Sequence, residues 1–319
     1  MSNLPIVGEH PAFMRVLELA RKAASADSTL LIVGETGTGK KLLARHVHDQ
    51  SRRATRPFIC VNCGAMSPEL LESDLFGHAE RDLHRSRFRA ADGGTVLLDQ
   101  VDELPPQVQA RLQAFLQHKE IRAVGSVEAT TVDIRLIAVA SRDIAQLVEE
   151  GRFRRDLYYQ LKVLSLQIPP LRERRSDIPF LAQHFLDAHN RLREPQSPCR
   201  LSDAAMTQLW QYDWPGNVRE LQSAIEQSVV FSGADTIDVP DLPPEIQAFH
   251  PSRNAPMPTI GAGGIDLDRL VAEFEAKLID EGLRRTKGNK QAAAQLLGLK
   301  RTTLVAKLRR RSAGADELP

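Results

Sequence analysis

The fold of this chain depends on one stretch, Leu30-Leu31-Ile32-Val33-Gly34-Glu35-Thr36-Gly37-Thr38-Gly39-Lys40. An apolar run ends at a glycine, further glycines and a lysine follow at the spacing G-x-x-x-x-G-K, and a helical pattern then continues to about His48. Glycines let the backbone fold around a phosphate chain with its N–H groups pointing inward, and a helix N-terminus adds a favourable dipole. The stretch therefore predicts a nucleotide loop in which Lys40 reaches the β- and γ-phosphates, with a plain glycine-rich turn as the alternative.

The second half of the site is expected at Val96-Leu97-Leu98-Asp99, a buried strand that ends in an acidic residue. The Asp99 carboxylate would hold Mg²⁺ directly or through water, and a helix-capping aspartate is the alternative. Gln100 follows where a hydrolase needs a carboxylate; an amide can hydrogen bond the attacking water but cannot take its proton. Lys41 stands where most such loops place the serine or threonine that binds Mg²⁺. The predicted cofactors are ATP or ADP, and Mg²⁺.

The pattern of strands and helices predicts several domains. Strands alternate with helices as far as Pro169-Pro170, which favours an α/β fold with a parallel sheet and a ligand at the carboxyl ends of the strands. From Asp177 to about Phe231 the chain reads as all-helical, and a segment rich in proline and glycine follows. The expected domains are an α/β nucleotide-binding subdomain at 1–168, a helical lid at 169–239, a linker at 240–264 and an all-α helix-turn-helix domain at 265–319.

Composition excludes some classes of protein. Charge is balanced, with 42 lysines and arginines against 41 aspartates and glutamates, so the net charge does not indicate a partner. No apolar run approaches membrane-spanning length, and the N-terminus lacks an export pattern. Three cysteines, an odd number, indicate a reducing cytoplasm rather than a disulfide framework. Cys60 and Cys63 form C-x-x-C and are interpreted as buried structural thiols, with a redox or zinc pair as the alternative.

The last domain shows a helix-turn-helix pattern. A first helix is expected from Asp266 to about Arg285, and two short helices at 290–297 and 301–311 are joined by Gly298-Leu299-Lys300. Every charged residue from Arg284 to Arg311 is basic, which favours a surface that binds DNA phosphates over a basic solubility tail. The predicted DNA-binding residues are Lys290, Lys300, Arg301, Thr302, Thr303, Lys307, Arg309 and Arg310.

Six further motifs accompany the nucleotide loop. They are Val61-Asn62-Cys63, Leu71-Glu72-Ser73-Asp74-Leu75-Phe76-Gly77-His78, Gly93-Gly94-Thr95, Phe153-Arg154-Arg155-Asp156-Leu157-Tyr158-Tyr159, Pro169-Pro170-Leu171-Arg172-Glu173-Arg174 and Trp214-Pro215-Gly216-Asn217-Val218-Arg219-Glu220-Leu221. With these motifs, residues 4–312 resemble a bacterial enhancer-binding protein of the NtrC-like AAA+ class, the activators of sigma-54 RNA polymerase. The tail resembles the Fis-type DNA-binding domain, and its Arg301-Thr302-Thr303-Leu304 is closest to the form that flagellar master regulators carry.

The resemblance implies a ring, usually hexameric, with ATP between subunits; a dimer stays open. Asn62 would be the switch partner of the acidic catalytic residue, Arg219 would contact nucleotide from its own subunit, and Arg154 would reach the neighbour's γ-phosphate. The catalytic residues would be Lys40, Asp99, Gln100 and Arg154, with Asp99 as the metal ligand. The cofactor-binding residues would be Gly34, Glu35, Thr36, Gly37, Thr38, Gly39, Lys40, Lys41, Asn62, Asp99 and Arg219.

The implied partners are double-stranded DNA, RNA polymerase holoenzyme of a sigma class left open, and copies of this chain or a competent paralogue in a mixed ring. A cytoplasmic location without a membrane is expected. No receiver or ligand-sensing domain is expected before the AAA+ module, because the chain begins at its edge.

The chain departs from the family pattern in its working parts. The G-A-F-T-G-A loop that grips sigma-54 should follow Phe76-Gly77-His78, but the segment is shorter and reads Ala79-Glu80-Arg81-Asp82-Leu83-His84-Arg85-Ser86-Arg87-Phe88. The other departures are Gln100 for the catalytic glutamate, Gln160 for a second finger arginine, Ala140-Ser141 for the sensor Thr-Asn pair and Lys41 for the usual glutamate.

These departures favour a DNA-binding transcription regulator that binds nucleotide, hydrolyses it poorly and does not activate sigma-54 polymerase alone. Two alternatives remain. One is a working ATP-hydrolysing sigma-54-dependent activator with a divergent contact loop. The other is a regulatory subunit that joins mixed rings with a competent paralogue.

Overall fold

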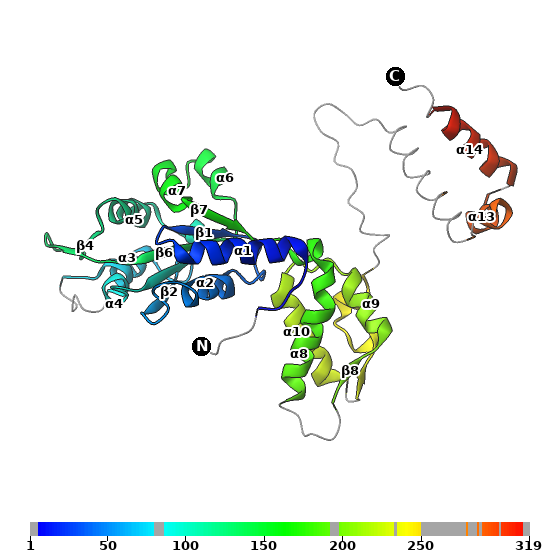
Figure 1. The fold of residues 1–319 in the computed structure, drawn as a ribbon, viewed down its shortest axis with the longest axis horizontal. Coiled ribbons are helices and arrows are strands. Elements are labelled where there is room, and N and C mark those ends of the chain that lie inside the picture. Colours follow the sequence, from blue (N-terminus) through cyan, green and yellow to red (C-terminus); the bar gives the residue numbers. More distant parts are fainter. Residues whose placement is uncertain are drawn as a thin grey trace. The chain divides into compact units, whose positions relative to one another are not determined.

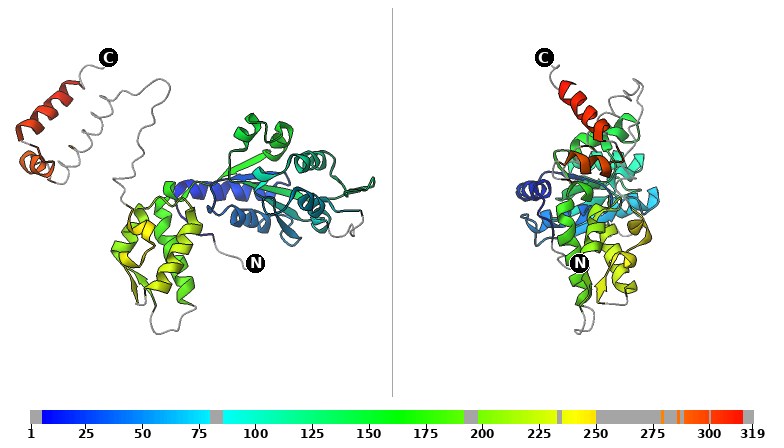
Figure 2. Two further views of the ribbon diagram at one scale, coloured as in Figure 1. Left: turned by 180° about the vertical axis from the view of Figure 1, so that it is seen from behind. Right: turned by 90° about the vertical axis from the view of Figure 1, so that its right-hand side faces the viewer.

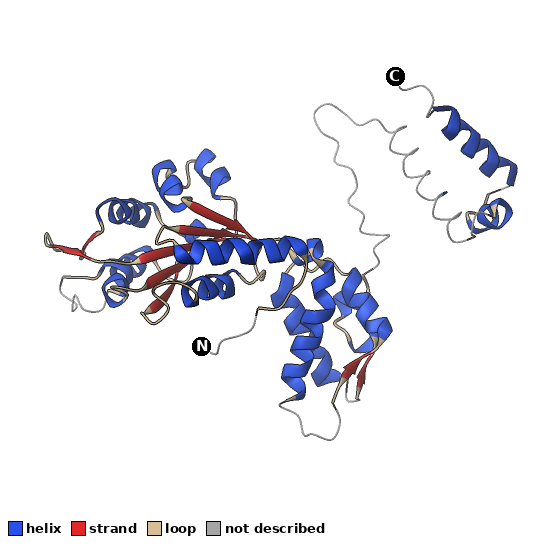
Figure 3. Cartoon of the chain, in the orientation of Figure 1, coloured by secondary structure: helices blue, strands red, loops and turns tan. Residues whose placement is uncertain are grey.

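A computed structural model of the chain describes residues 6–79, 86–191, 198–232, 235–249, 279, 286, 289–299 and 301–314. The chain divides into two compact units, Met1–Asn254 and Ala255–Pro319. The first unit contains an α/β subdomain and a helical lid, and the second contains the helices near the C-terminus (Figures 1 and 3). Within the described ranges, no helix is long and apolar enough to span a bilayer.

The α/β subdomain is built on a parallel sheet of five strands in the order β2-β3-β6-β1-β7. The sequence does not predict β7, a short edge strand in which only Leu166 is buried. The sequence predicts the other four strands, at 30–33, 57–62, 96–99 and 136–140, and each is confirmed within a residue or two. The strands are β1 (Leu30–Val33), β2 (Phe58–Asn62), β3 (Thr95–Asp99), β6 (Arg135–Ala140) and β7 (Leu164–Gln167).

Helices cover both faces of this sheet. Successive residues of a strand point to opposite faces, so Leu30 and Ile32 of β1 pack with α1 and α2, whereas Leu31 packs in the core that α3, α5 and α7 help to form. The sequence does not predict the short helix α6. The helices are α1 (Pro11–Ser25), α2 (Lys40–Asp49), α3 (Pro68–Phe76), α4 (Arg87–Ala90), α5 (Pro106–His118), α6 (Ile144–Glu149) and α7 (Arg155–Leu161). The sequence also predicts a pair of strands near 121–135, and the structure has an antiparallel hairpin there, β4 (Glu120–Arg122) and β5 (Ala129–Thr131).

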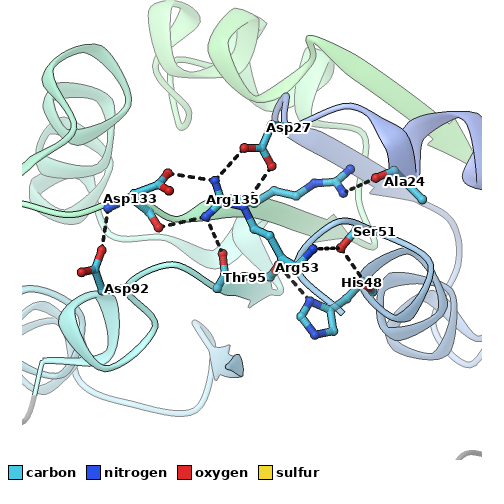
Figure 4. Close-up of polar contacts among 10 residues, drawn as sticks. Ala24, Asp27, His48, Ser51, Arg53, Asp92, Thr95, Asp133 and Arg135 are labelled. Atoms are coloured by element: carbon cyan, nitrogen blue, oxygen red, sulfur yellow. Dashed lines mark hydrogen bonds and ion pairs between the residues drawn. The ribbon is translucent and has the colours of Figure 1, made fainter. Parts of the chain in front are cut away.

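A polar cluster lies at the end of the sheet where the strands begin (Figure 4). Arg53 donates hydrogen bonds to Asp27 at 2.6 Å, to Asp133 at 2.8 Å and to the carbonyl of Gly94 at 3.2 Å. Arg135, which is buried, donates to the carbonyls of Ala23 and Ala24 in the last turn of α1, where a helix has carbonyls without a partner inside the helix. These contacts join α1 and the segments that follow α1 and α2 to the starts of β3 and β6. They lie at the opposite end of the strands from the nucleotide loop.

The lid is a helical bundle beside the carboxyl ends of the strands (Figures 1 and 2). Its helices are α8 (Ile178–Asn190), α9 (Asp203–Gln211) and α10 (Asn217–Phe231). The expectation of an all-helical segment is wrong at one point, because β8 (Arg200–Leu201) pairs in parallel with β9 (Thr236–Ile237). Trp214 is fully buried in the lid core, where its indole N–H donates to the Leu209 carbonyl at 2.8 Å.

The lid extends further along the chain than the sequence predicts. The 3₁₀ turn η5 (Val239–Asp241) and the helix α11 (Pro244–Gln247) occupy the start of the predicted linker. Leu242 and Ile246 are buried in the lid core, and the ring of Phe249 packs against that of Tyr212. Pro240, Pro243 and Pro244 lie at the starts of these short helical turns rather than in a linker, and apolar residues between and after them are buried.

The second unit contains the two helices of the predicted helix-turn-helix, α13 (Lys290–Leu296) and α14 (Arg301–Gly314). Asn289 caps α13 by accepting hydrogen bonds from the N–H groups of Gln291 and Ala292. Gly298 turns the chain with a φ of 66°. A small core is formed by Ile279, Ala293, Ala294 and Leu304. Apart from Ile279, the helix predicted from Asp266 to Arg285 lies outside the described residues.

Candidate nucleotide-binding site

The glycine loop joins β1 to α2, which begins at Lys40, as the sequence predicts. Gly39 caps the helix with a φ of 101°, in the left-handed region that favours glycine. Gly37 has a φ of 83°, and a Cβ atom added there would lie 2.0 Å from the carbonyl oxygen of Gly216 in the lid. Only glycine therefore allows the loop and the lid to approach this closely.

Lys40 lies inside the loop. Its ammonium donates hydrogen bonds to the carbonyl oxygens of Gly34 at 2.6 Å and Glu35 at 2.8 Å. Burial lowers the pKa of Lys40, and the carboxylate of Asp99 acts in the opposite direction. A cation held on loop carbonyls in this way is placed to exchange them for phosphate oxygens.

Asp99 ends β3 and is nearly buried, with a side chain 9% exposed. Its Oδ2 lies 2.6 Å from the Nζ of Lys41, the residue after the loop lysine. The sequence predicts that Asp99 holds Mg²⁺, which takes oxygen ligands in octahedral geometry. Lys41 supplies no oxygen at this position and places a positive charge on the predicted carboxylate ligand. These residues therefore do not fit a magnesium ion held by Asp99.

Asn62 ends β2, Gln100 follows Asp99 at the end of β3, and Ser141 follows β6, so all three lie at the carboxyl ends of adjacent strands. Asn62 pairs in register with Asp99, and its amide oxygen accepts a hydrogen bond from the Gly64 N–H at 3.0 Å. Gln100 has a φ of 59°, a backbone conformation uncommon outside glycine that is concentrated at functional sites. All three side chains line the same cavity.

This cavity has a volume of about 570 Å³ and lies between the α/β subdomain and the lid. Its polar lining comes from the loop and the strand ends described above. Its apolar lining includes Val7, Phe13 and Ile168, and the lid contributes Arg219. A lining that combines apolar residues with cations beside a phosphate loop suits a nucleotide, whose base is flat and whose phosphates are charged.

Two lid residues that the sequence did not single out attach the lid to the loop. The Asn217 amide donates to the Glu35 carboxylate at 3.1 Å and to the Thr36 carbonyl at 3.0 Å. Arg172 forms a bidentate ion pair with Glu35, which lowers the pKa of that carboxyl. Both residues lie in motifs quoted for the family resemblance, yet only the folded chain shows that they meet the phosphate loop.

Arg174 is a third such residue. It is buried, donates to the carbonyl of Thr38 at 3.2 Å and stacks its guanidinium on the ring of Phe13 at 4.3 Å. Asp177 lies 3.7 Å from Arg174 and accepts the N–H groups of Glu9 and His10, which holds the start of the chain against the lid.

Arg154 does not line the cavity. It is exposed at the start of α7, where it pairs with Asp156 at 2.8 Å. The side-chain oxygen of Gln160 is buried and has no hydrogen-bond partner among the described residues, so Gln160 is turned inward rather than projecting beside Arg154. The cavity and the predicted finger are therefore separate features of this chain.

Other predicted residues lie outside this cavity. Lys290, Arg301, Thr302 and Thr303 are exposed on α13 and α14, and Lys307 is half-buried. Lys300 and the side chains of Arg309 and Arg310 lie outside the described residues, as does the centre of the segment where the sigma-54 grip loop was expected.

Cys63 is buried, but Cys60 is exposed, so the interpretation of both as buried thiols is wrong for Cys60. Its strand β2 is an edge strand of the sheet. In the part of the chain that the structure describes, no group of histidines, cysteines and carboxylates could hold a metal ion.

Comparisons with known proteins agree with this architecture. The sigma-54 interaction domain family matches residues 6–167, the AAA+ ATPase lid domain family matches residues 172–258, and the Fis family of bacterial regulatory proteins matches residues 270–310. The chain is 42% identical over 315 residues to the transcriptional regulatory protein ZraR of Escherichia coli O157:H7, which covers 97% of this chain and 69% of ZraR. It is 39% identical over 331 residues to the transcriptional regulatory protein FlbD of Caulobacter vibrioides, covering 99% of this chain and 72% of FlbD.

Among solved structures, the crystal structure of NtrX from Brucella abortus in complex with ATP matches with a TM-score of 0.73 and 30% sequence identity. The match covers 96% of this chain and 69% of the NtrX chain. The chain therefore belongs to the NtrC-like enhancer-binding proteins, DNA-binding transcriptional regulators with a sigma-54 interaction AAA+ module and a Fis-type helix-turn-helix domain.

Proposed function

We propose that this regulator binds ATP or ADP in order to assemble and occupy DNA, and that it hydrolyses ATP poorly. In this proposal it does not remodel sigma-54 polymerase by itself, and it acts at promoters of another sigma class or by occupying its DNA site. Nucleotide binding is supported by the loop geometry around Lys40 and by the ATP and ADP complexes of the similar NtrX. DNA binding is supported by the exposed basic residues Lys290 and Arg301 on the helix-turn-helix.

Gln100 is the observation that carries the proposal. It lines the cavity next to Asp99, where a hydrolase of this class needs a base for the attacking water. The amide of Gln100 has no proton affinity at neutral pH, so it can hold the water but cannot deprotonate it. Loss of a general base typically costs ~10²–10⁴-fold in rate.

A second candidate function is supported by Arg154. Arg154 is exposed and does not line the nucleotide cavity of its own chain. This placement suits a cation that serves the active site of a neighbouring subunit. A chain that hydrolyses poorly but supplies this arginine would act as a regulatory subunit in a mixed ring with a competent paralogue.

The test is to measure ATP binding and ATP hydrolysis side by side for the full-length chain and for Lys40→Ala. We expect the wild-type chain to bind ATP, Lys40→Ala to lose at least about tenfold in affinity, and both chains to release phosphate at the background rate. Brisk hydrolysis that depends on Lys40, together with open-complex formation at a sigma-54 promoter by the chain alone, would instead indicate a working activator.

A further inference from the structure

Two adjacent lysines begin α2, and their position is unfavourable for a helix on its own. The N-terminus of a helix carries a partial positive charge, so cations are normally found at the other end. The first turn of α2 contains Lys40 and Lys41 and no acidic residue. A compensating negative group must therefore come from outside the helix.

For Lys41 that group is Asp99, on a different element of the fold. The 2.6 Å contact between Lys41 Nζ and Asp99 Oδ2 crosses from the first turn of α2 to the end of β3. Lys40 does not share this place, because its ammonium is bound by the carbonyls of Gly34 and Glu35 inside the loop. The two ammonium groups thus occupy different positions in one cavity.

We propose that the Lys41 ammonium takes the place of a magnesium ion at this site, so that ATP or ADP binds to this chain without a divalent cation. The inference rests on the nucleotide binding proposed above. A magnesium ion in such sites neutralises β- and γ-phosphate oxygens and connects them to the acidic residue at the strand end. An ammonium has three N–H donors, so one can remain on Asp99 while the others face phosphate oxygens.

The surroundings of Asp99 are consistent with this assignment. A magnesium ion keeps close to octahedral geometry with oxygen ligands, and a neighbouring ammonium repels it. Asn62, in register with Asp99 on β2, and Gln100, the residue after Asp99, are neutral amides that line the cavity, and the Asn62 oxygen already accepts the Gly64 N–H. Lys41 is half-exposed, so its side chain can adjust to the bound phosphates without disturbing the core.

Isothermal titration calorimetry with ATP tests the inference, with the full-length chain in excess Mg²⁺ and again in EDTA. The wild-type dissociation constant is expected to differ by less than about twofold between the two conditions. Lys41→Thr introduces the hydroxyl with which many phosphate loops bind Mg²⁺, and its affinity is expected to fall at least about tenfold in EDTA relative to Mg²⁺. Arg45→Thr is the matched control, because Arg45 lies on the same helix and pairs with Asp49 outside the cavity.

The outcomes are distinguishable. A wild-type chain that binds ATP about tenfold or more weakly in EDTA would overturn the inference while leaving nucleotide binding intact. Equal affinities for folded Lys41→Thr in both conditions, verified by circular dichroism, would overturn the assignment to Lys41. A chain that binds no ATP in either condition would refute the proposed function itself.

Discussion

The side-chain amide of Asn217, at the start of the lid helix α10, donates a hydrogen bond of 3.1 Å to the carboxylate of Glu35 in the phosphate loop. Asn217 is fully buried, has a left-handed φ of 55°, and accepts the N–H of Leu171 at 2.8 Å. One side chain therefore connects the lid, the loop and the segment that joins them.

Asn217→Gly removes these hydrogen bonds without straining the left-handed backbone, since glycine adopts this φ freely. We expect a loss of about 2–3 kcal/mol in the free energy of unfolding, because buried partners are left unpaired. Urea denaturation followed by circular dichroism measures it. Arg172→Ala, which removes the half-exposed ion pair to the same Glu35, should cost less than about 1 kcal/mol. Equal losses for the two variants would contradict the central role of Asn217.

Gln100→Glu supplies the missing carboxylate, and combining it with Lys41→Thr also opens the position that Lys41 occupies. We expect the double variant to hydrolyse ATP at least about tenfold faster than either single variant in the presence of Mg²⁺, because base and metal act together. Steady-state phosphate release measures the rates. Adding Lys40→Ala to the double variant should return the rate to background, and a rapid wild-type rate would leave nothing for these changes to restore.

Arg154→Ala removes an exposed side chain whose guanidinium pairs with Asp156 at the start of α7. The free energy of unfolding and the ATP affinity of one protomer should not change measurably, because an exposed ion pair contributes little and Arg154 lies outside the cavity. Nucleotide-dependent assembly, followed by sedimentation velocity, should weaken if Arg154 serves a neighbouring subunit. Arg155→Ala is the adjacent exposed control, and an equal effect of both variants on assembly would argue against a specific finger.

Acid should destabilise the α/β subdomain through His48. This histidine is buried, its Nδ1 lies 2.9 Å from the Thr95 hydroxyl, and burial lowers its pKa. A lowered folded-state pKa means that the unfolded chain binds the proton first, so stability is present above a pH of about 6.5 and is lost as the pH falls toward the folded-state value. The loss reaches at most about 1.4 kcal/mol per pH unit for one proton.

Urea titrations at a series of pH values check this dependence. His48→Gln should reduce the slope of unfolding free energy against pH, whereas His118→Gln, at an exposed position, should leave it unchanged. Burial also lowers the pKa of His46, so part of the slope should remain in His48→Gln. An unchanged slope in His48→Gln would exclude His48 as the source.

Lys290→Ala and Arg301→Ala should weaken binding of double-stranded DNA by similar factors for all sequences. Both residues are exposed on the helix-turn-helix, and removing one cation from a DNA phosphate should reduce the slope of log K against log salt by about one. Fluorescence anisotropy with a labelled duplex at several salt concentrations measures the slope. Gln291→Ala, also exposed on α13, is the uncharged control, and an unaltered slope in the lysine and arginine variants would place the DNA elsewhere.

The sequence by itself determined the nucleotide loop, four of the five sheet strands, the lid helices and the helix-turn-helix. Each of these depends on residues that are close together in the chain: a hydrophobic periodicity, a glycine at a turn of the backbone, or a residue that caps a helix. The spacing from Gly34 to Lys40 was sufficient to predict the loop, because a phosphate-binding loop with this spacing adopts one backbone conformation. The same local rules missed β7, a short strand in which only Leu166 is buried, and placed the end of the lid too early because prolines were taken for a linker.

Only the tertiary structure decided which side chains of the site contact one another. Lys41 and Asp99 are far apart in sequence and yet 2.6 Å apart, because the parallel sheet brings the end of β3 beside the start of α2. The contacts of Asn217 and Arg172 with Glu35 likewise require the lid to return to the loop. Hydrophobic periodicity and motif spacing describe one segment of the chain at a time. An ion pair between two segments depends on strand register and on packing, which no single segment encodes.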